Sequence, residues 1–402
     1  MRKTITIGDL GTIITGKTPP TTNKNYYGDY AVFIKPTDIS EQSKYTYETE
    51  EMYSKLAAEK YESSLIPKGA ICVPCIGTIG TKMTMAPCEC YTNQSINSII
   101  CNENYDNEYV YYLIKNFLPG LKSYNLGTAS GREYVSKSNF EKIELVAEQD
   151  KTIQIKIGKF LSRYDSLIEN YQKQIKLLEE AAQRLYKEWF VDLHFPGHQS
   201  TPIINNLPEG WEKRKIGDFA RIKSGFAFKS KDWQTLGCPV VKIKDITGTF
   251  VSTNDLDCVP IEVARNASSF VLNKGDLVIA MTGATIGKIG LLTENGIYTN
   301  QRVGKFFMND KYLLPFSYCF FKQETTTKMI LQISSSSSAQ PNIRGGQLES
   351  FEFACNSKLI NDFNLIMYPC FSQMIHLKSQ INLLAEARDR LLPKLMSAEI
   401  EV

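Results

Sequence analysis

The chain has 402 residues, of which 43% are hydrophobic, and this is enough material for two or three domains with packed cores. Its net charge of +3 is too small to establish a nucleic-acid partner, because the clustering of charge matters more than its total. No run of 18 or more apolar residues is present, which argues against a membrane span. The opening segment MRKTITIGDLG lacks the apolar stretch of a secretion signal, so we interpret it as a first strand.

The ten cysteines show no small-domain disulfide pattern. Disulfides are rare inside cells, and we expect free thiols in a cytoplasmic protein.

Short motifs recur along the chain in the same order, about 206 to 209 residues apart. The recurring pairs are Ile7-Gly8-Asp9 with Ile216-Gly217-Asp218, Lys35, Asp38 and Ile39 with Lys242, Asp245 and Ile246, Lys68-Gly69 with Lys274-Gly275, Ile79-Gly80 with Ile286-Gly287, Tyr91-Thr92-Asn93-Gln94 with Tyr298-Thr299-Asn300-Gln301, Leu177-Leu178 with Leu383-Leu384, and Arg184-Leu185 with Arg390-Leu391. A period of half the chain excludes a short-repeat solenoid. It predicts two copies of one domain, each with an appended element.

The first part of each copy has the pattern of mixed strands and turns, since short β-branched runs alternate with Gly and Pro. The second part has apolar residues spaced by three and four, which predicts one long helix with a heptad seam. The seam of the first helix contains one extra step of four between Tyr171 and Ile175, a stutter. Pro369 and Pro393 interrupt the second seam, and we expect a kink or a helix start near each. The residues expected to pack the helices or dock a partner are Ile157, Phe160, Tyr164, Leu167, Tyr171, Leu178 and Leu185 in the first helix and Met374, Leu377, Ile381, Leu384 and Leu391 in the second.

Two such seams, one per copy, are expected to pack on each other. If a pseudo-twofold axis relates the copies, the helices run antiparallel, and a helix of about 35 residues spans roughly 50 Å. The alternative is that each helix covers only its own globular domain. We therefore predict an α+β protein in which two long antiparallel coiled-coil helices separate two mixed α/β domains.

Three segments resemble the specificity subunits of type I restriction–modification enzymes. They are the run YKEWFVDLHFPG from Tyr186 to Gly197, the run LPEGW from Leu207 to Trp211 ahead of the second Ile-Gly-Asp, and the ending LLPKLMSAEIEV from Leu391 to Val402. The resemblance covers the whole chain, including the duplicated order of domain and helix. It implies target-recognition domains at residues 1–148 and 209–355, long helices at 149–193 and 356–402, and a linker at 194–208.

The same resemblance implies a subunit that is not itself an enzyme and that binds no cofactor or metal. Each recognition domain would read one half of a bipartite site on double-stranded DNA, and the helices would set the gap. The helices would also dock two adenine methyltransferase subunits, which carry S-adenosylmethionine. Restriction subunits, which use ATP and Mg, would join that core. Half-sites about one helical turn, roughly 34–36 Å, apart suit two readers on one side of B-DNA.

Several polar side chains in or beside turns are candidates for contacts with phosphates or base edges. The candidates are Lys17, Lys82, Arg132, Lys223, Lys229, Lys288, Gln340, Asn342 and Arg344. For any single residue the alternative is ordinary solvated surface charge. The segments around Arg132 and Gln340 differ between the copies, as two different half-sites would require.

Other motifs favour structural interpretations. The amides of the repeated Asn-Gln pairs suit adenine contacts, but their presence in both copies favours a role in fixing turns. Gly77, Gly80, Gly283 and Gly287 indicate a strand–turn position, because the spacing of a phosphate-binding loop is missing. Cys72-Val-Pro-Cys75 has the spacing of a zinc site, yet its repeat equivalents are Val278 and Met281, so we interpret these cysteines as core residues.

His194 and His198 have ligand-like spacing but lie in a linker with Pro and Gly, which argues against a metal. We find no adenine-methyltransferase motif, Walker A loop, HExxH or nucleophile elbow. A fused restriction nuclease–methyltransferase would need a catalytic half for which this chain has no room. A coiled-coil scaffold that binds no DNA is the remaining alternative.

Overall fold

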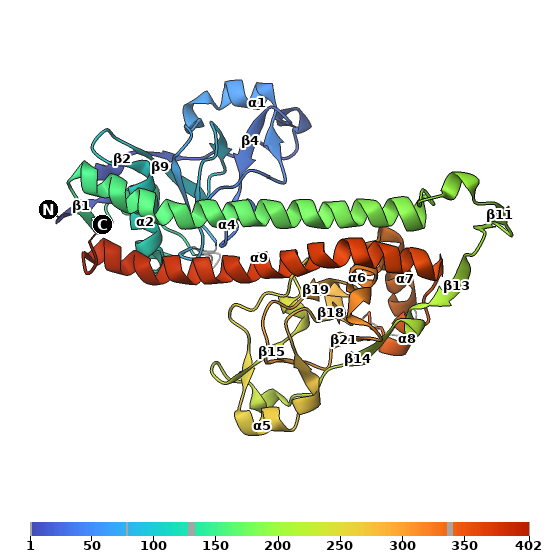
Figure 1. Cartoon of the computed structure of the whole chain (residues 1–402). Coiled ribbons are helices and arrows are strands. Elements are labelled where there is room, and N and C mark those ends of the chain that lie inside the picture. The colour runs from blue at the N-terminus through green and yellow to red at the C-terminus, as the bar shows by residue number, and fades with distance from the viewer. Residues whose placement is uncertain (1, 78, 128–132, 336–340, 402) are drawn as a thin grey trace. The chain divides into compact units, whose positions relative to one another are not determined.

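The computed structural model describes residues 2–77, 79–127, 133–335 and 341–401, which belong to two compact units (Figure 1). Unit 1 comprises Met1–Asn170 together with Ile381–Val402. Unit 2 comprises Tyr171–Gln380. Each unit therefore combines one globular copy of the repeat with part of both long helices, α4 (Lys151–Tyr186) and α9 (Ser357–Ser397).

Unit 1 contains two four-stranded sheets and one strand pair. Their orders are β2-β9-β6-β7, β3-β5-β4-β8 and β1-β10, and β4 pairs with β8 in parallel while the other pairs are antiparallel. The strands are β1 (Arg2–Thr6), β2 (Gly11–Thr15), β3 (Tyr27–Gly28), β4 (Ala31–Ile34), β5 (Met52–Tyr53), β6 (Ile71–Pro74), β7 (Thr84–Met85), β8 (Tyr91–Thr92), β9 (Ile96–Cys101) and β10 (Glu144–Glu148). The short helices are α1 (Lys55–Lys60), α2 (Asn107–Phe117) and α3 (Lys137–Glu141).

Unit 2 repeats the first sheet and the strand pair strand for strand, whereas its second sheet lacks a counterpart of β3 and gains the edge strand β17. Its orders are β14-β21-β18-β19, β16-β15-β20-β17 and β13-β22, and here β15 pairs with β20 in parallel. The strands are β13 (Glu212–Lys215), β14 (Ala220–Ser224), β15 (Cys238–Val241), β16 (Cys258–Val259), β17 (Val271–Leu272), β18 (Leu277–Ala280), β19 (Ile289–Leu291), β20 (Ile297–Thr299), β21 (Val303–Met308) and β22 (Glu352–Cys355), with the hairpin β11 (Ile203–Ile204) and β12 (Leu207–Pro208) ahead of them. The short helices are α5 (Ile261–Arg265), α6 (Leu314–Lys322), α7 (Glu324–Ser335) and α8 (Gly345–Glu349).

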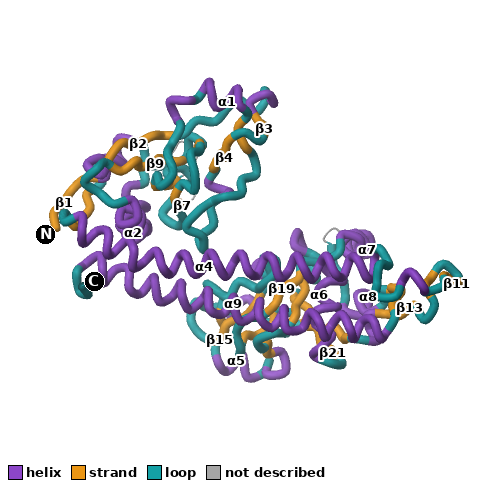
Figure 2. The backbone as a smooth tube through the Cα atoms, turned by 45° about the horizontal axis from the view of Figure 1, so that its top comes forward, coloured by secondary structure: helices purple, strands orange, loops and turns teal. Residues whose placement is uncertain are grey.

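The central strands β6 and β18 are buried along their whole length, which explains their continuous apolar sequences. Figure 2 shows strands and helices mixed within each unit. The predicted α+β class, with a repeated mixed domain and long antiparallel helices, is confirmed. Among the described residues, no helix combines the length and the hydropathy that a membrane crossing requires.

Along both long helices, one series of buried residues recurs at every seventh position. In α4 these residues are Gln154, Leu161, Ile168, Ile175, Ala182 and Trp189, the last just beyond its end, and in α9 they are Ile360, Met367, Met374, Ile381, Arg388 and Leu395. In unit 1 the start of α4 shares a hydrophobic cluster with the end of α9. In unit 2 the end of α4 shares one with the start of α9. The helices are thus antiparallel in each unit, with the seven-residue period of a coiled coil.

Three sequence expectations about the helices need correction. The stutter is absent, since the buried positions of α4 keep a period of seven from Gln154 to Trp189. Leu167, expected in the seam, is 39% exposed. A helix start near Pro369 or Pro393 is also wrong, because α9 continues unbroken for 41 residues with both prolines on its exposed face. The carbonyls that lose a partner there remain open to water, which limits the cost.

A buried charge pair joins the two helices inside unit 1. The Arg388 guanidinium donates to Asp165, and Tyr112 on α2 donates to the same carboxylate. Burial alone would lower the pKa of Arg388, but Asp389 and Asp165 hold it above its ordinary value. In unit 2 the acid that ties α4 to the globular part is Glu179, whose side chain is half-buried, with 19% exposure.

Glu179 accepts hydrogen bonds from Thr249 at 2.6 Å and Tyr318 at 2.5 Å, and Lys322 pairs with it at 3.1 Å. Burial acts to raise the pKa of Glu179, but these partners outweigh it and lower the pKa below its ordinary value. Each unit is therefore tied to the helices by one satisfied carboxylate.

We predict that Arg388→Met strongly destabilises the chain, by about 3–5 kcal/mol, because it leaves Asp165 buried without its counter-charge. Urea unfolding followed by circular dichroism measures the loss. The matched control is Arg390→Ala, whose partner Glu386 is exposed, and which should cost less than about 1 kcal/mol. Equal losses from the two variants would contradict a structural role for the buried pair.

We also predict a pH-dependent effect of Glu179→Gln. A carboxyl with a lowered folded pKa stabilises the fold above its unfolded pKa of about 4.3, and loses that contribution as the pH falls through the folded value. The variant should therefore be less stable than the parent at pH 7, and the difference should shrink below about pH 5. Urea unfolding at several pH values tests this, with exposed Glu180→Gln as the control. A pH-independent difference would refute it.

Candidate nucleic-acid interface

The repeated Asn-Gln pairs form the same turn in both units. This Asn-Gln turn comprises residues 93–96 in unit 1 and 300–303 in unit 2. The Asn93 side chain accepts a hydrogen bond from the Ser95 amide at 3.0 Å, and the Asn300 side chain accepts one from the Arg302 amide at 3.3 Å. These asparagines therefore shape the backbone, which agrees with the structural interpretation of the motif.

A glycine faces the turn at very close range in each unit. A Cβ on Gly16 would lie 2.1 Å from the Thr92 carbonyl oxygen, and one on Gly225 would lie 2.3 Å from that of Thr299. The next residue donates its amide hydrogen to the same threonine carbonyl in both units. Only glycine permits this approach.

A second segment, residues 133–135 in unit 1 and 341–343 in unit 2, is attached to the turn through one residue. In unit 1 the Cys75 amide donates to the Ser95 carbonyl at 2.7 Å, while the Cys75 carbonyl accepts from the Val135 amide at 2.9 Å. In unit 2 Met281 makes the same two bonds, with Arg302 and Ile343, both at 2.9 Å. Turn and segment are thus held together identically in both units.

In unit 2 this arrangement borders a hollow of about 410 Å³. It is lined by Ser224, Met281, Thr282, Gln301, Arg302, Asn342, Ile343 and Arg344. The described residues that line it include two arginines and no carboxylate, so it suits an electronegative ligand. Arg344 is the N-cap residue directly before α8, and its backbone amide donates to the Gln347 side chain at 2.8 Å.

The structure brings only some of the predicted DNA-contact residues together. Asn342 and Arg344 share the hollow, and the Lys17 amide bonds to the Thr92 carbonyl beside the turn of unit 1. Lys223, Lys229 and Lys288 are exposed outside the hollow, and Lys82 is half-buried. Arg132 and Gln340 lie outside the described residues.

Sequence reasoning missed Arg302. It directly follows the recurring Tyr-Thr-Asn-Gln run, but the equivalent residue of the first copy is Ser95. A search for repeated residues passes over such a position. The useful signal is the reverse, a residue that differs immediately beside a run that repeats.

Cys72, Cys75 and His198, from the motifs with metal-like spacing, occupy structural positions. Cys72 and Cys75 are buried in two different hydrophobic clusters, and burial raises the pKa of the Cys75 thiol to about 12. His198 donates through Nδ1 to the Phe195 carbonyl at 2.9 Å in the linker. Among the described residues, no cluster of three or more His, Cys, Asp or Glu side chains could hold a metal ion.

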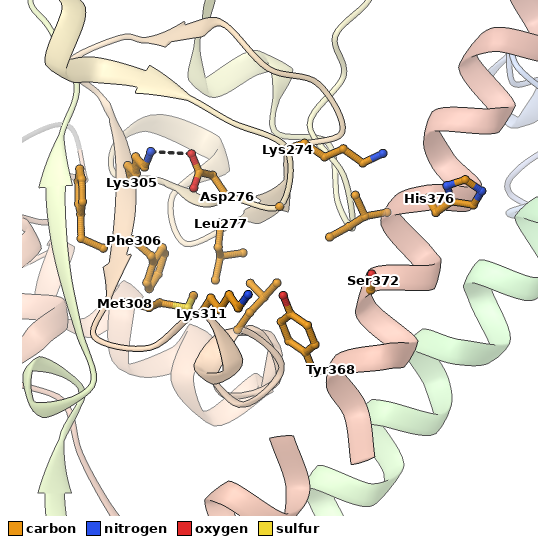
Figure 3. A pocket seen from close by; sticks show the side chains of 14 residues that line it. Lys274, Asp276, Leu277, Lys305, Phe306, Met308, Lys311, Tyr368, Ser372 and His376 are labelled. Atoms are coloured by element: carbon orange, nitrogen blue, oxygen red, sulfur yellow. Dashed lines mark ion pairs between the residues drawn. The ribbon is translucent and has the colours of Figure 1, made fainter. Parts of the chain in front are cut away.

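A larger pocket of about 600 Å³ lies in unit 2 between α9 and the strands β18 and β21 (Figure 3). Its lining includes the Asp276–Lys305 ion pair at 2.6 Å, and Ser372 and His376 on α9. Among the described residues no hydrogen bond joins Ser372 to His376, and the single carboxylate of the lining is neutralised by Lys305. The pocket thus lacks the nucleophile–base geometry of a catalytic site.

Comparison with known proteins places the chain among specificity subunits. The family model of the type I restriction modification DNA specificity domain matches residues 2–180 and 208–355. The chain belongs to this family. It is 25% identical over 410 residues to the type I restriction enzyme MjaIX specificity subunit of Methanocaldococcus jannaschii, covering 98% of this chain and 93% of that protein. The prediction of a non-catalytic specificity subunit is thereby confirmed.

Two further comparisons agree in sequence and in fold. The HindI specificity subunit of Haemophilus influenzae is 36% identical over 177 residues, 43% of this chain and 38% of that protein. The crystal structure of the type I restriction-modification system S subunit from M. genitalium has a TM-score of 0.58 at 17% identity. It covers 98% of this chain and 96% of that one, so the fold is shared along the chain.

We predict that Asn300→Ala weakens the turn of unit 2 by about 1 kcal/mol, because the Arg302 amide loses its acceptor. Asn300→Asp, which keeps an acceptor oxygen, is the matched control and should retain most of the stability. Urea unfolding midpoints of the two variants and the parent measure the difference. Identical midpoints for Ala and Asp would show that the side-chain bond does not hold the turn.

Proposed function

We propose that this specificity subunit reads a bipartite DNA site, with residues 1–148 and 209–355 each recognising one half. The observation that carries the proposal is the duplication of one turn-and-segment geometry in two units that share most of their sheet topology. Two like scaffolds in one chain suit two separate half-sites. The candidate contacts of the first domain are Lys17, Lys82 and Arg132, and those of the second are Lys223, Lys229, Lys288, Gln340, Asn342 and Arg344.

In this proposal α4 and α9 set the gap between the half-sites. At 36 and 41 residues they measure about 54 and 62 Å, more than one turn of B-DNA. The seven-residue period of their buried positions and the Asp165–Arg388 ion pair favour a stiff pair of helices. A stiff element is what a fixed spacing requires.

The same helices are the proposed docking surface for two adenine methyltransferase subunits, through which restriction subunits join. Leu177 on α4 and Leu365 and Leu383 on α9 are largely exposed, and apolar groups on long helices suit docking by partner helices. S-adenosylmethionine would be bound by the methyltransferase subunits, and ATP and Mg by the restriction subunits.

The test is the adenine methylation map of cells that express the partner methyltransferase, with and without this chain. A split motif with an unspecified gap should be methylated only when the chain is present. Co-purification of the methyltransferase is the control for assembly. Assembly without any new methylation would refute DNA specification, and failure of both would favour a scaffold without a DNA role.

A further inference from the structure

The two Asn-Gln turns share a backbone but present different side chains. In both units the turn is fixed by the hydrogen bond that its asparagine side chain accepts and by the close approach of a glycine. The backbone bonds to Cys75 in unit 1, or to Met281 in unit 2, hold it as well. On this common frame, Ser95 of unit 1 corresponds to Arg302 of unit 2. Tyr134, which forms a β-bridge with Ile76, corresponds to Asn342, which forms one with Thr282.

The glutamine of the turn also differs between the units in its hydrogen bonding. In unit 1 Gln94 accepts a hydrogen bond from the Thr18 hydroxyl, two residues after Gly16. Two residues after Gly225, unit 2 has Ala227, whose methyl group offers no such bond. Among the described residues Gln301 has no hydrogen-bond partner, and both Gln301 and Arg302 are exposed at the hollow. Unit 2 therefore presents two consecutive residues with planar polar side chains at the hollow, neither of them engaged by another side chain among the described residues.

We propose that Arg302 and Gln301 are the base-reading residues of unit 2, with Arg302 recognising a guanine and Gln301 the neighbouring base. This inference rests on the proposed function. An arginine fork matches the O6 and N7 acceptors of guanine, and a glutamine amide matches N6 and N7 of adenine. Position 95 in unit 1 and position 302 in unit 2 thus determine specificity, while the shared backbone of the turn does not itself select a DNA sequence.

Competing roles for Arg302 fit less well. A structural arginine of a folded domain is usually paired, but among the described residues Arg302 has no carboxylate partner, unlike Arg221, which pairs with Glu349 at 2.9 Å. A contact to phosphate alone would need no planar neighbour and would weaken binding to every sequence alike. The adjacent free amide of Gln301 favours reading of base edges.

The experiment compares methylation maps given by the parent chain, Arg302→Ala, Gln301→Ala and the control Arg265→Ala, each with the same methyltransferase. Arg265 is an exposed arginine on α5 of the same unit. In the Arg302 variant, one specified guanine position of one half-site should lose at least about tenfold of its discrimination. The other half-site should be unchanged. Gln301→Ala should relax a neighbouring position in the same half, and Arg265→Ala should leave the map intact.

Three results would overturn the inference. They are an unaltered motif with Arg302→Ala, a uniform loss of methylation at all sites, and relaxation in both halves. Thermal unfolding and co-purification with the methyltransferase separate these outcomes from misfolding, and Arg302→Gln offers a second planar substitution if Arg302→Ala is unstable. If the parent chain itself yields no split motif, the proposed function fails instead, so the two failures are distinguishable.

Discussion

The antiparallel pairing of α4 and α9 is the constraint on which both units depend. The core of unit 1 requires Leu392, Leu395 and Met396 from the far end of the chain, and that of unit 2 requires Ala182 and Tyr186 from the first helix. Neither sequence repeat therefore contains a complete unit. Each copy is completed by the helix of the other, which couples the folding of the two halves of the chain through contacts of high sequence separation.

Polar residues at this helix pairing determine its register, which apolar packing alone does not. Leucine-like side chains tolerate neighbouring registers, whereas a buried carboxylate tolerates only the register that brings its partner. Asp165 meets Arg388 in unit 1, and Glu179 meets Tyr318 and Lys322 in unit 2. The two acids sit fourteen residues apart, two heptads along α4, at equivalent positions of its seven-residue period. They fix how α4 lies in each unit.

The sequence was sufficient to predict two domains, two long helices and their antiparallel order, because repetition and heptad spacing are long-range signals. It misplaced part of the seam of α4, because the prediction for that helix counted apolar residues only. Asp165 is buried and Glu179 half-buried at positions that such a count assigns to the surface, and their omission accounts for the false stutter and the inward placement of Leu167. The partners that make these acids acceptable inside, such as Tyr112 and Arg388, are distant in sequence.

The residues of the Asn-Gln turn that repeat in both copies have a structural role. Asn93 and Asn300 repeat because both turns need the same internal acceptor, and Gly16 and Gly225 repeat because both need the same close approach. These residues build the turn alike in both units, so under the proposed function they could not distinguish two half-sites. Under that proposal, discrimination would come from positions where the copies differ, such as Ser95 and Arg302, of which Arg302 is exposed at the hollow. Because Asn300 and Gly225 hold the turn and Arg302 does not, a substitution at position 302 should cost little stability. A solvated arginine gives up no internal bond when it is replaced.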